Sequence, residues 1–151
     1  MTRRVPLARG RGAAGSALVE VSWLALLLLV PLVYILLGVF DVQRASYGVS
    51  AATRAAGRAF ALAPDVATAR EWAVQAAAVA LRDQGLRLDP AALTITCRPT
   101  ASACLQPGSS AHVALSVQVP LPLLPDALGS VASIRVSSSH LAPYGSFREA
   151  R

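Results

Sequence analysis

The sequence predicts an α+β fold with a long N-terminal helix, a second helix, and a small antiparallel β-sheet of about three strands. Residues 21–40 form one apolar run, and apolar residues then recur at helical spacing through residues 42–63 and 66–84. After Pro90 the apolar residues alternate with polar ones, as is typical of half-buried strands. Because a small sheet with one apolar face needs a cover, we expect the helices to pack against it.

We expect the first helix to cover residues 16–63 and to cross a membrane over residues 21–40, which contain no charged side chain. At about 1.5 Å per residue this run measures roughly 30 Å, the thickness of a hydrocarbon core. A cleaved signal peptide normally has a shorter apolar core followed by a small-residue cleavage site, so a retained anchor is the better interpretation. Pro31 lacks a backbone donor, and we expect it to kink the helix.

Beyond the membrane span, small residues form one stripe along the first helix, which allows another element to approach closely. The stripe comprises Val42, Ala45, Val49, Ala52, Ala56, Ala59 and Ala63. Pro64 interrupts this helix, and Asp65 is the predicted N-cap of a second one. We expect the second helix to cover residues 66–84 and to stop at Gly85. Its predicted buried face comprises Ala69, Trp72, Ala76, Val79 and Ala80.

Three segments after Pro90 alternate between apolar and polar residues and therefore predict strands. Their apolar members are Leu93, Ile95 and Cys97, then Val113, Leu115, Val117 and Val119, then Ala132, Ile134 and Val136. The predicted organisation is a basic leader at residues 1–15, the first helix at 16–63, an extracytoplasmic α+β domain at 64–145, and a flexible tail at 146–151.

The chain carries a formal net charge of +6, and all 14 of its basic residues are arginines. Those that precede the apolar run are Arg3, Arg4, Arg9 and Arg11. By the positive-inside rule this leader places the N-terminus in the cytoplasm, and the single span then places the C-terminal domain outside it. The remaining arginines are scattered and lack interleaved aromatic residues, so we expect no nucleic-acid partner.

Cys97 and Cys104 are the two cysteines of the chain. They lie beyond the membrane span, in a compartment predicted to be oxidising, which favours a disulfide over two free thiols. A bridge that closes a loop of about eight residues is worth roughly 2.5 kcal/mol in the chain-entropy model. A zinc site is disfavoured because zinc needs a second pair of ligands.

No motif in the sequence indicates an enzyme. It contains no Gly-x-Ser-x-Gly nucleophile elbow, no glycine-rich phosphate loop and no metal-binding His/Glu spacing. Its two histidines, His112 and His140, are predicted at strand edges and are too few for a catalytic set. We therefore expect no catalytic residues, no cofactor and no bound metal.

Glu20 lies five residues after Gly15, at the entrance to the apolar run. If the chain is cut between Gly15 and Ser16, the new amine and the Glu20 carboxylate can neutralise each other within or between subunits. In a bundle of such helices this pairing would set the axial register of neighbours. Alternatively, Glu20 lies in the headgroup region, where water makes its charge harmless.

The basic leader, Gly15, Ser16, Glu20 and the apolar helix resemble the processing site and helix of type IV prepilins. This resemblance implies that a prepilin peptidase cuts between Gly15 and Ser16 and that Glu20 guides assembly. It also implies that the partners are the lipid bilayer, other pilin or pseudopilin subunits, and inner-membrane platform proteins.

The stretch Gly15-Ser-Ala-Leu-Val-Glu20, the leucine-rich span with Pro31, and residues 38–44 resemble more specifically the TadE-like family. Members of that family are membrane-anchored pseudopilins of the tight-adherence (Tad, Flp) pilus system. The resemblance covers about residues 11–60, and the sheet region agrees only in general character.

These observations predict a non-enzymatic minor pilin or pseudopilin of a Tad pilus assembly or a type II/IV-like secretion apparatus, acting by helix packing and subunit assembly. The alternative is a single-pass envelope protein whose outer domain binds a partner without entering a filament. A third interpretation, a secreted domain released after signal cleavage, predicts soluble protein outside the cell.

Overall fold

The computed structural model describes residues 14–120 and 133–147 of the 151-residue chain, with side chains from residue 17 onward. Most of the predicted leader and the end of the predicted tail, residues 1–13 and 148–151, lie outside the described residues. The chain divides into two compact units, Met1–Leu37 and Gly38–Arg151. Helix α1 contributes residues to both units, because it covers Ala14–Leu62.

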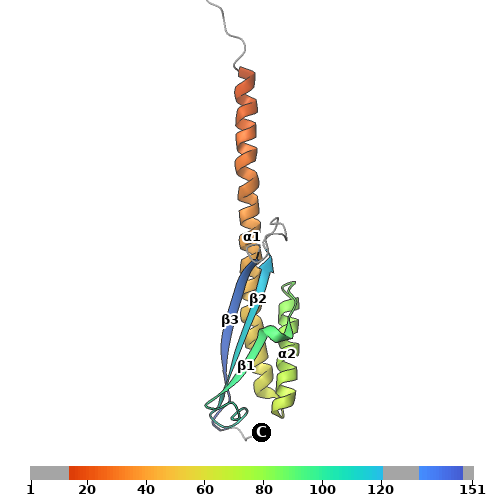
Figure 1. Ribbon diagram of the computed structural model, residues 1–151, viewed down its shortest axis with the longest axis vertical. Coiled ribbons are helices and arrows are strands. Elements are labelled where there is room, and N and C mark those ends of the chain that lie inside the picture. The colour runs from red at the N-terminus through yellow and green to blue at the C-terminus, as the bar shows by residue number, and fades with distance from the viewer. Residues whose placement is uncertain (1–13, 121–132, 148–151) are drawn as a thin grey trace, which may run out of the picture. The chain divides into compact units, whose positions relative to one another are not determined.

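Helix α1 confirms the predicted long N-terminal helix and is 49 residues long (Figure 1). It stays helical through Pro31, and the kink expected there remains a prediction. The helix ends at Leu62, two residues before Pro64, in agreement with the aversion of residues before proline to the helical region.

In the first unit, the large apolar side chains of α1 are exposed. Leu18 and Trp23 are 73% and 70% exposed, and Leu27 is 65% exposed. A helix that is apolar all round its circumference normally lies in a protein core or in lipid. The described residues of this unit form no protein core around α1, so its apolar surface is that of a candidate membrane-spanning helix.

In the second unit, three antiparallel strands form one sheet in the order β1-β2-β3. Strand β1 covers Leu93–Arg98, β2 covers Ser110–Pro120 and β3 covers Ser133–Pro143. A short 3₁₀ turn, η1, at Pro90–Ala92 leads into β1. The observed elements confirm the α+β fold with a second helix and a three-stranded antiparallel sheet.

Helix α2 covers Val66–Arg82 and begins at the predicted N-cap. The Asp65 carboxylate accepts hydrogen bonds from the backbone N–H of Thr68 at 2.9 Å and from its hydroxyl at 2.8 Å. These bonds satisfy donors that the first turn of a helix leaves free. The helix ends two residues earlier than expected, and Gly85, with a φ of +71°, makes the turn that follows.

One hydrophobic core joins the second half of α1, α2 and one face of the sheet (Figure 1). The small-residue stripe of α1 is largely confirmed: Ala45, Val49, Ala52, Ala56 and Ala63 are at most 1% exposed. Val42 and Ala59 are only partly buried. Phe60, which the stripe did not include, is the largest fully buried side chain.

The predicted buried face of α2 is wrong at its two largest residues. Trp72 and Val79 are 43% and 55% exposed, whereas the residues that are fully buried are Ala69, Ala73, Ala77 and Leu81. The prediction followed the bulky side chains of α2. The structure instead buries a row with three alanines against the small residues of α1, because two helices come close only where both side chains are small.

The predicted inward faces of β1 and β2 are confirmed, with Val113 and Leu115 almost fully buried. Strand β3 agrees at Val136, which packs against the core. Ile134 was predicted to be inward but is 41% exposed, since it lies near one end of an edge strand and has strand neighbours on one side only. Ala132 lies outside the described residues.

Candidate functional site

Helix α1 is long and apolar enough to cross a membrane. An 18-residue window within Ala17–Leu62 has a mean hydropathy of 2.7, and only 6% of that window is buried. It is the length and the composition of the helix that make it a candidate span, and it lies near the N-terminus. The apolar part of α1 is therefore the first part of the candidate site, as a candidate membrane-spanning helix.

The predicted processing site lies in the first turn of α1. Gly15 and Ser16 directly follow Ala14, where the described part of α1 begins, so the bond between them lies in a helical segment.

Glu20 projects from α1 with an exposed side chain. Among the residues that the structure describes, its carboxylate has no ion-pair partner. The hydroxyl of Ser22 is satisfied locally, since it donates to the backbone carbonyl of Leu18 at 2.8 Å. The described first turns of α1 therefore present one exposed carboxylate without an ion-pair partner among the described residues.

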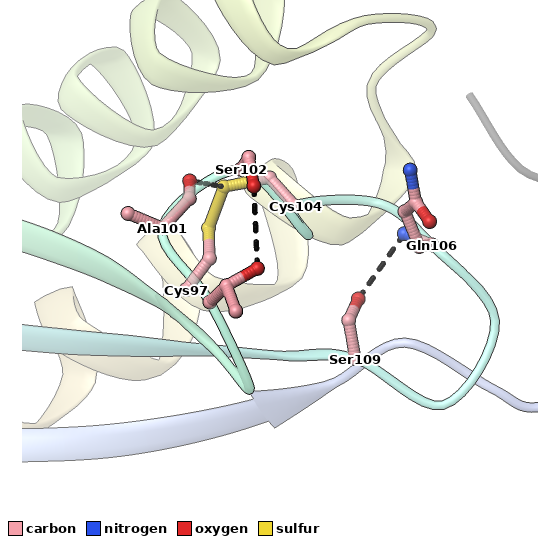
Figure 2. Close-up of a disulfide and its surroundings, with 7 residues drawn as sticks. Cys97, Ala101, Ser102, Cys104, Gln106 and Ser109 are labelled. Atoms are coloured by element: carbon pink, nitrogen blue, oxygen red, sulfur yellow. Dashed lines mark hydrogen bonds between the residues drawn. A yellow bond between two sulfur atoms is a disulfide. The ribbon is translucent and has the colours of Figure 1, made fainter.

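A disulfide joins Cys97 at the end of β1 to Cys104 in the following loop, as predicted (Figure 2). The two Cα atoms are 5.3 Å apart, and the cysteines are 8% and 4% exposed. Within the same loop, the backbone N–H of Gln106 donates to the hydroxyl of Ser109 at 3.1 Å (Figure 2). The covalent bridge and this turn hold the loop against the core.

The bridged loop meets the end of α1 in the core. Phe60 lines a small cavity together with Cys97, Cys104 and Leu105, and Tyr144 closes it from the segment after β3. The loop therefore ties the far end of α1 to the sheet. Sequence spacing alone did not indicate this contact, because Phe60 lies outside the stripe of small residues.

The two histidines lie on opposite faces of the sheet. His112 and Thr96 are register partners on the face away from the core, while His140 is the partner of the buried Val113. A Cβ added to Gly57 of α1 would lie 3.0 Å from Cδ2 of His140, so this imidazole packs against the helix. Within residues 14–120 and 133–147, no group of three or more His, Cys, Asp or Glu side chains could hold a metal ion.

Two electrostatic interactions in the described part of the second unit are local. Arg44 forms an ion pair with Asp41 one turn earlier in α1, at 3.3 Å, with both side chains about half exposed. The backbone N–H and then the hydroxyl of Thr68 hold the pKa of Asp65 below its ordinary value, because both donate to the charged carboxylate. Neither arrangement resembles catalytic machinery, which relies on titratable groups that converge in a cleft.

Sequence reasoning did not single out a recess at the C-terminal end of α2. It is lined by Ala78, Arg82, Leu86, Arg87 and Leu88. The sequence did contain an indication of this recess. Arg82 and Arg87 lie on either side of Gly85, the predicted helix stop, and a chain reversal at Gly85 can bring both arginines onto one surface.

Comparison of the chain with protein-family models, with curated proteins and with solved structures finds no match. The arrangement itself is that of an apolar helix followed by a disulfide-bonded α+β unit.

Proposed function

We propose that this protein is a membrane-anchored minor pilin or pseudopilin, a structural subunit of a Tad pilus assembly or of a type II/IV-like secretion apparatus. In this proposal residues 21–40 cross the membrane, the N-terminus is cytoplasmic, and the α+β unit lies outside the cytoplasm. The observation that carries the proposal is the prepilin-like segment from Gly15 to Glu20, placed directly before a continuous apolar helix.

The two units support this assignment in different ways. The exposed apolar surface of the first unit fits a helix that contacts lipid or the helices of other subunits rather than its own domain. The bond between Cys97 and Cys104 fits an oxidising compartment, and so a domain outside the cytoplasm. No catalytic step is part of the proposal.

Glu20 would act by pairing with the amine of Ser16 in a neighbouring subunit after cleavage. A charge near the hydrocarbon region is costly unless it is compensated, and a neighbouring amine provides that compensation at one axial position only. Packed helices would therefore adopt one register. The pairing makes Glu20 an assembly residue rather than a catalytic one.

The cleavage step is tested by sequencing the N-terminus of protein extracted from membranes. We expect the mature chain to begin at Ser16, because the prepilin pattern places the scissile bond after Gly15. A chain that begins at Met1 or Thr2 would contradict the processing step.

The assembly step is tested with Glu20→Gln, which removes the charge and keeps the shape of the side chain. A hydrogen-bonded charged group is worth about 1.5–3 kcal/mol, so we expect recovery of the subunit with assembled pilus components to fall about 10- to 100-fold. Glu71→Gln is the matched control, since Glu71 is an exposed carboxylate on α2. If both variants assemble like the parent chain, the protein is instead an anchored envelope protein outside any filament.

A further inference from the structure

An open recess of about 480 Å³ lies at the C-terminal end of α2. Two arginines and three alkyl side chains line it: Ala78, Arg82, Leu86, Arg87 and Leu88. Arg82 is the last residue of α2, and Arg87 follows the turn made by Gly85. The turn therefore brings two guanidinium groups from neighbouring segments to one surface.

Neither arginine of the recess is neutralised by the described part of the chain. The ion pair of Arg44 with Asp41 does not involve Arg82 or Arg87, and neither of the two has a carboxylate partner among the described residues. The nearest acidic residues in sequence are Asp83 and Asp89, and neither lines the recess.

The carboxylate of Asp89 is already engaged, because it accepts a hydrogen bond from the backbone N–H of Ala91 at 3.0 Å. Asp83 is the C-cap residue of α2. Two like charges that share a recess repel each other, and an anion bound between them would relieve that repulsion.

The turn beside the recess packs on residues of α1 that directly follow the predicted membrane span. A Cβ added to Gly48 of α1 would lie 3.0 Å from Cγ of Gln84 and 3.4 Å from Cδ1 of Leu86. One added to Gly85 would lie 3.8 Å from Nη1 of Arg44. The turn after α2 therefore packs on residues 44–48 of α1, and α2 itself runs beside the later part of that helix (Figure 1).

Arg44 follows the last residue of the apolar run, Phe40, by four positions, which is about 6 Å of helix. If residues 21–40 lie in the bilayer, this short separation from Phe40 keeps Arg44 near the lipid headgroups. Arg82 and Arg87 flank the turn that packs on residues 44–48, so they lie near the same part of α1.

We infer that Arg82 and Arg87 bind the phosphate of an anionic phospholipid headgroup, while Leu86 and Leu88 contact its glycerol and the first carbons of its acyl chains. This inference rests on the membrane anchoring in the proposed function. The planar guanidinium presents paired N–H donors that match phosphate oxygens, and anionic leaflets attract basic residues near their surface. A recess of this size is within the range of about 300–1,000 Å³ typical of small-molecule sites.

The alkyl side chains favour a lipid over free phosphate. An inorganic anion would use the two guanidinium groups and leave Leu86 and Leu88 without a role, whereas a phospholipid has both a charged and an apolar part. The contact would hold the second unit at the bilayer surface before assembly.

The test uses the full-length protein in neutral detergent micelles, titrated with phosphatidylglycerol or phosphatidylcholine, with bound lipid counted by native mass spectrometry. We expect the parent chain to prefer phosphatidylglycerol. Each arginine near an anionic surface contributes about fivefold, so Arg82→Gln with Arg87→Gln should lower phosphatidylglycerol affinity about 25-fold. The matched control is Arg54→Gln with Arg58→Gln, which removes two exposed arginines of α1 and should change affinity less than twofold.

Several outcomes would overturn the inference. Equal losses in both double variants would mean general charge attraction, and equal binding of the two lipids would mean no phosphate site. Displacement of phosphatidylglycerol by low millimolar inorganic phosphate would identify a free-anion site. If circular dichroism shows the double variant unfolded, Arg87→Gln alone, in the loop, should still lower affinity about fivefold, and an unchanged affinity would reject the site.

The lipid-binding experiment can fail or succeed independently of the proposed pilin function. Lipid selectivity in micelles requires no pilus component, whereas the Glu20→Gln experiment measures assembly only. Selective lipid binding with unaffected assembly of Glu20→Gln would reject the pilin assignment and keep the lipid site. If the parent chain shows no lipid selectivity but Glu20→Gln has the expected assembly defect, the lipid site is rejected and the pilin assignment is kept.

Discussion

The two halves of α1 have the same secondary structure and opposite surfaces. In the first half, leucines dominate, and Leu28 is 62% exposed. In the second half, the inward positions are mostly alanines, and Ala52 and Ala56 are fully buried. The comparison shows that side-chain size along a helix indicates its partner: small residues where protein elements approach closely, and large aliphatic residues where no protein element covers the helix.

Phe60 is the exception that clarifies this rule. It lies in the second half, yet it is large and 1% exposed. It lines a cavity with the disulfide and Leu105, where the covering element is a loop rather than a close-packed helix. A loop leaves more space above a helix than α2 does, and a phenyl ring fills that space.

The largest expected effect comes from truncating one large side chain in each half. Phe60→Ala should lower the free energy of unfolding of the second unit by about 3–5 kcal/mol, because it removes a buried ring and leaves a cavity. Leu28→Ala should change it by less than about 0.5 kcal/mol, since Leu28 contacts no core. Thermal unfolding of the detergent-solubilised chain, followed by circular dichroism, measures both. Similar losses would break the comparison of the two halves.

A smaller effect is expected at two glycines within the second half. A Cβ at Gly57 would lie 3.0 Å from Cβ of Ala142, a side-chain atom that is attached directly to the backbone of β3 and cannot move without it. Gly57→Ala should therefore destabilise the second unit by about 1 kcal/mol, after allowance for its gain in helix propensity.

Gly48→Ala is the matched variant: its Cβ would lie 3.0 Å from Cγ and 3.1 Å from Cβ of Gln84, which belongs to the turn after α2 and can shift more easily than a paired strand. We expect its helix propensity to dominate and to stabilise the unit by up to about 1 kcal/mol. The same thermal unfolding experiment compares the two, and a destabilised Gly48→Ala together with a neutral Gly57→Ala would show that the sheet approaches α1 less closely than described.

The smallest effect is expected where α1 ends and α2 begins. Asp65→Ala should lower the melting temperature slightly, because α2 loses the acceptor for the N–H and hydroxyl of Thr68. These bonds lower the pKa of Asp65 from its ordinary value of 3.8, so near that pH the unfolded chain binds more protons than the folded one.

The stability from Asp65 is therefore complete above that ordinary pKa and is lost as the pH falls through the lowered pKa of the folded chain. Melting temperatures of the parent chain and Asp65→Ala should converge over this acidic range. A difference that persists unchanged to the lowest pH would contradict the charged N-cap.

Much of the fold could be predicted because it depends on local features of the chain. The period of apolar residues distinguishes helix from strand, Pro64 and Asp65 mark the junction of the two helices, and the spacing of Cys97 and Cys104 suits a short bridged loop. Both helices, the three strands, the N-cap and the disulfide were predicted for this reason, although α2 ends two residues earlier than expected and β3 extends beyond the predicted alternation to Pro143. The processing site and the role of Glu20 stay predictions.

The buried face of α2 could not be predicted, because its apolar residues occupy more than one row. Trp72 and Val79 form one apolar row, and Ala73 and Ala77 belong to another. The sequence of α2 by itself does not say which row faces α1. The choice depends on the small residues that α1 presents, and so on the pairing of two segments.

By itself, the sequence determined which segments are helical or extended and that residues 21–40 are apolar enough for a bilayer, since both follow from the order of neighbouring residues. Only the tertiary structure decided which row of α2 is buried, that Phe60 meets the disulfide loop, and that Arg82 and Arg87 share a recess beside residues 44–48. These features depend on close packing between distant segments, and packing is selected by the shapes of both partners at once.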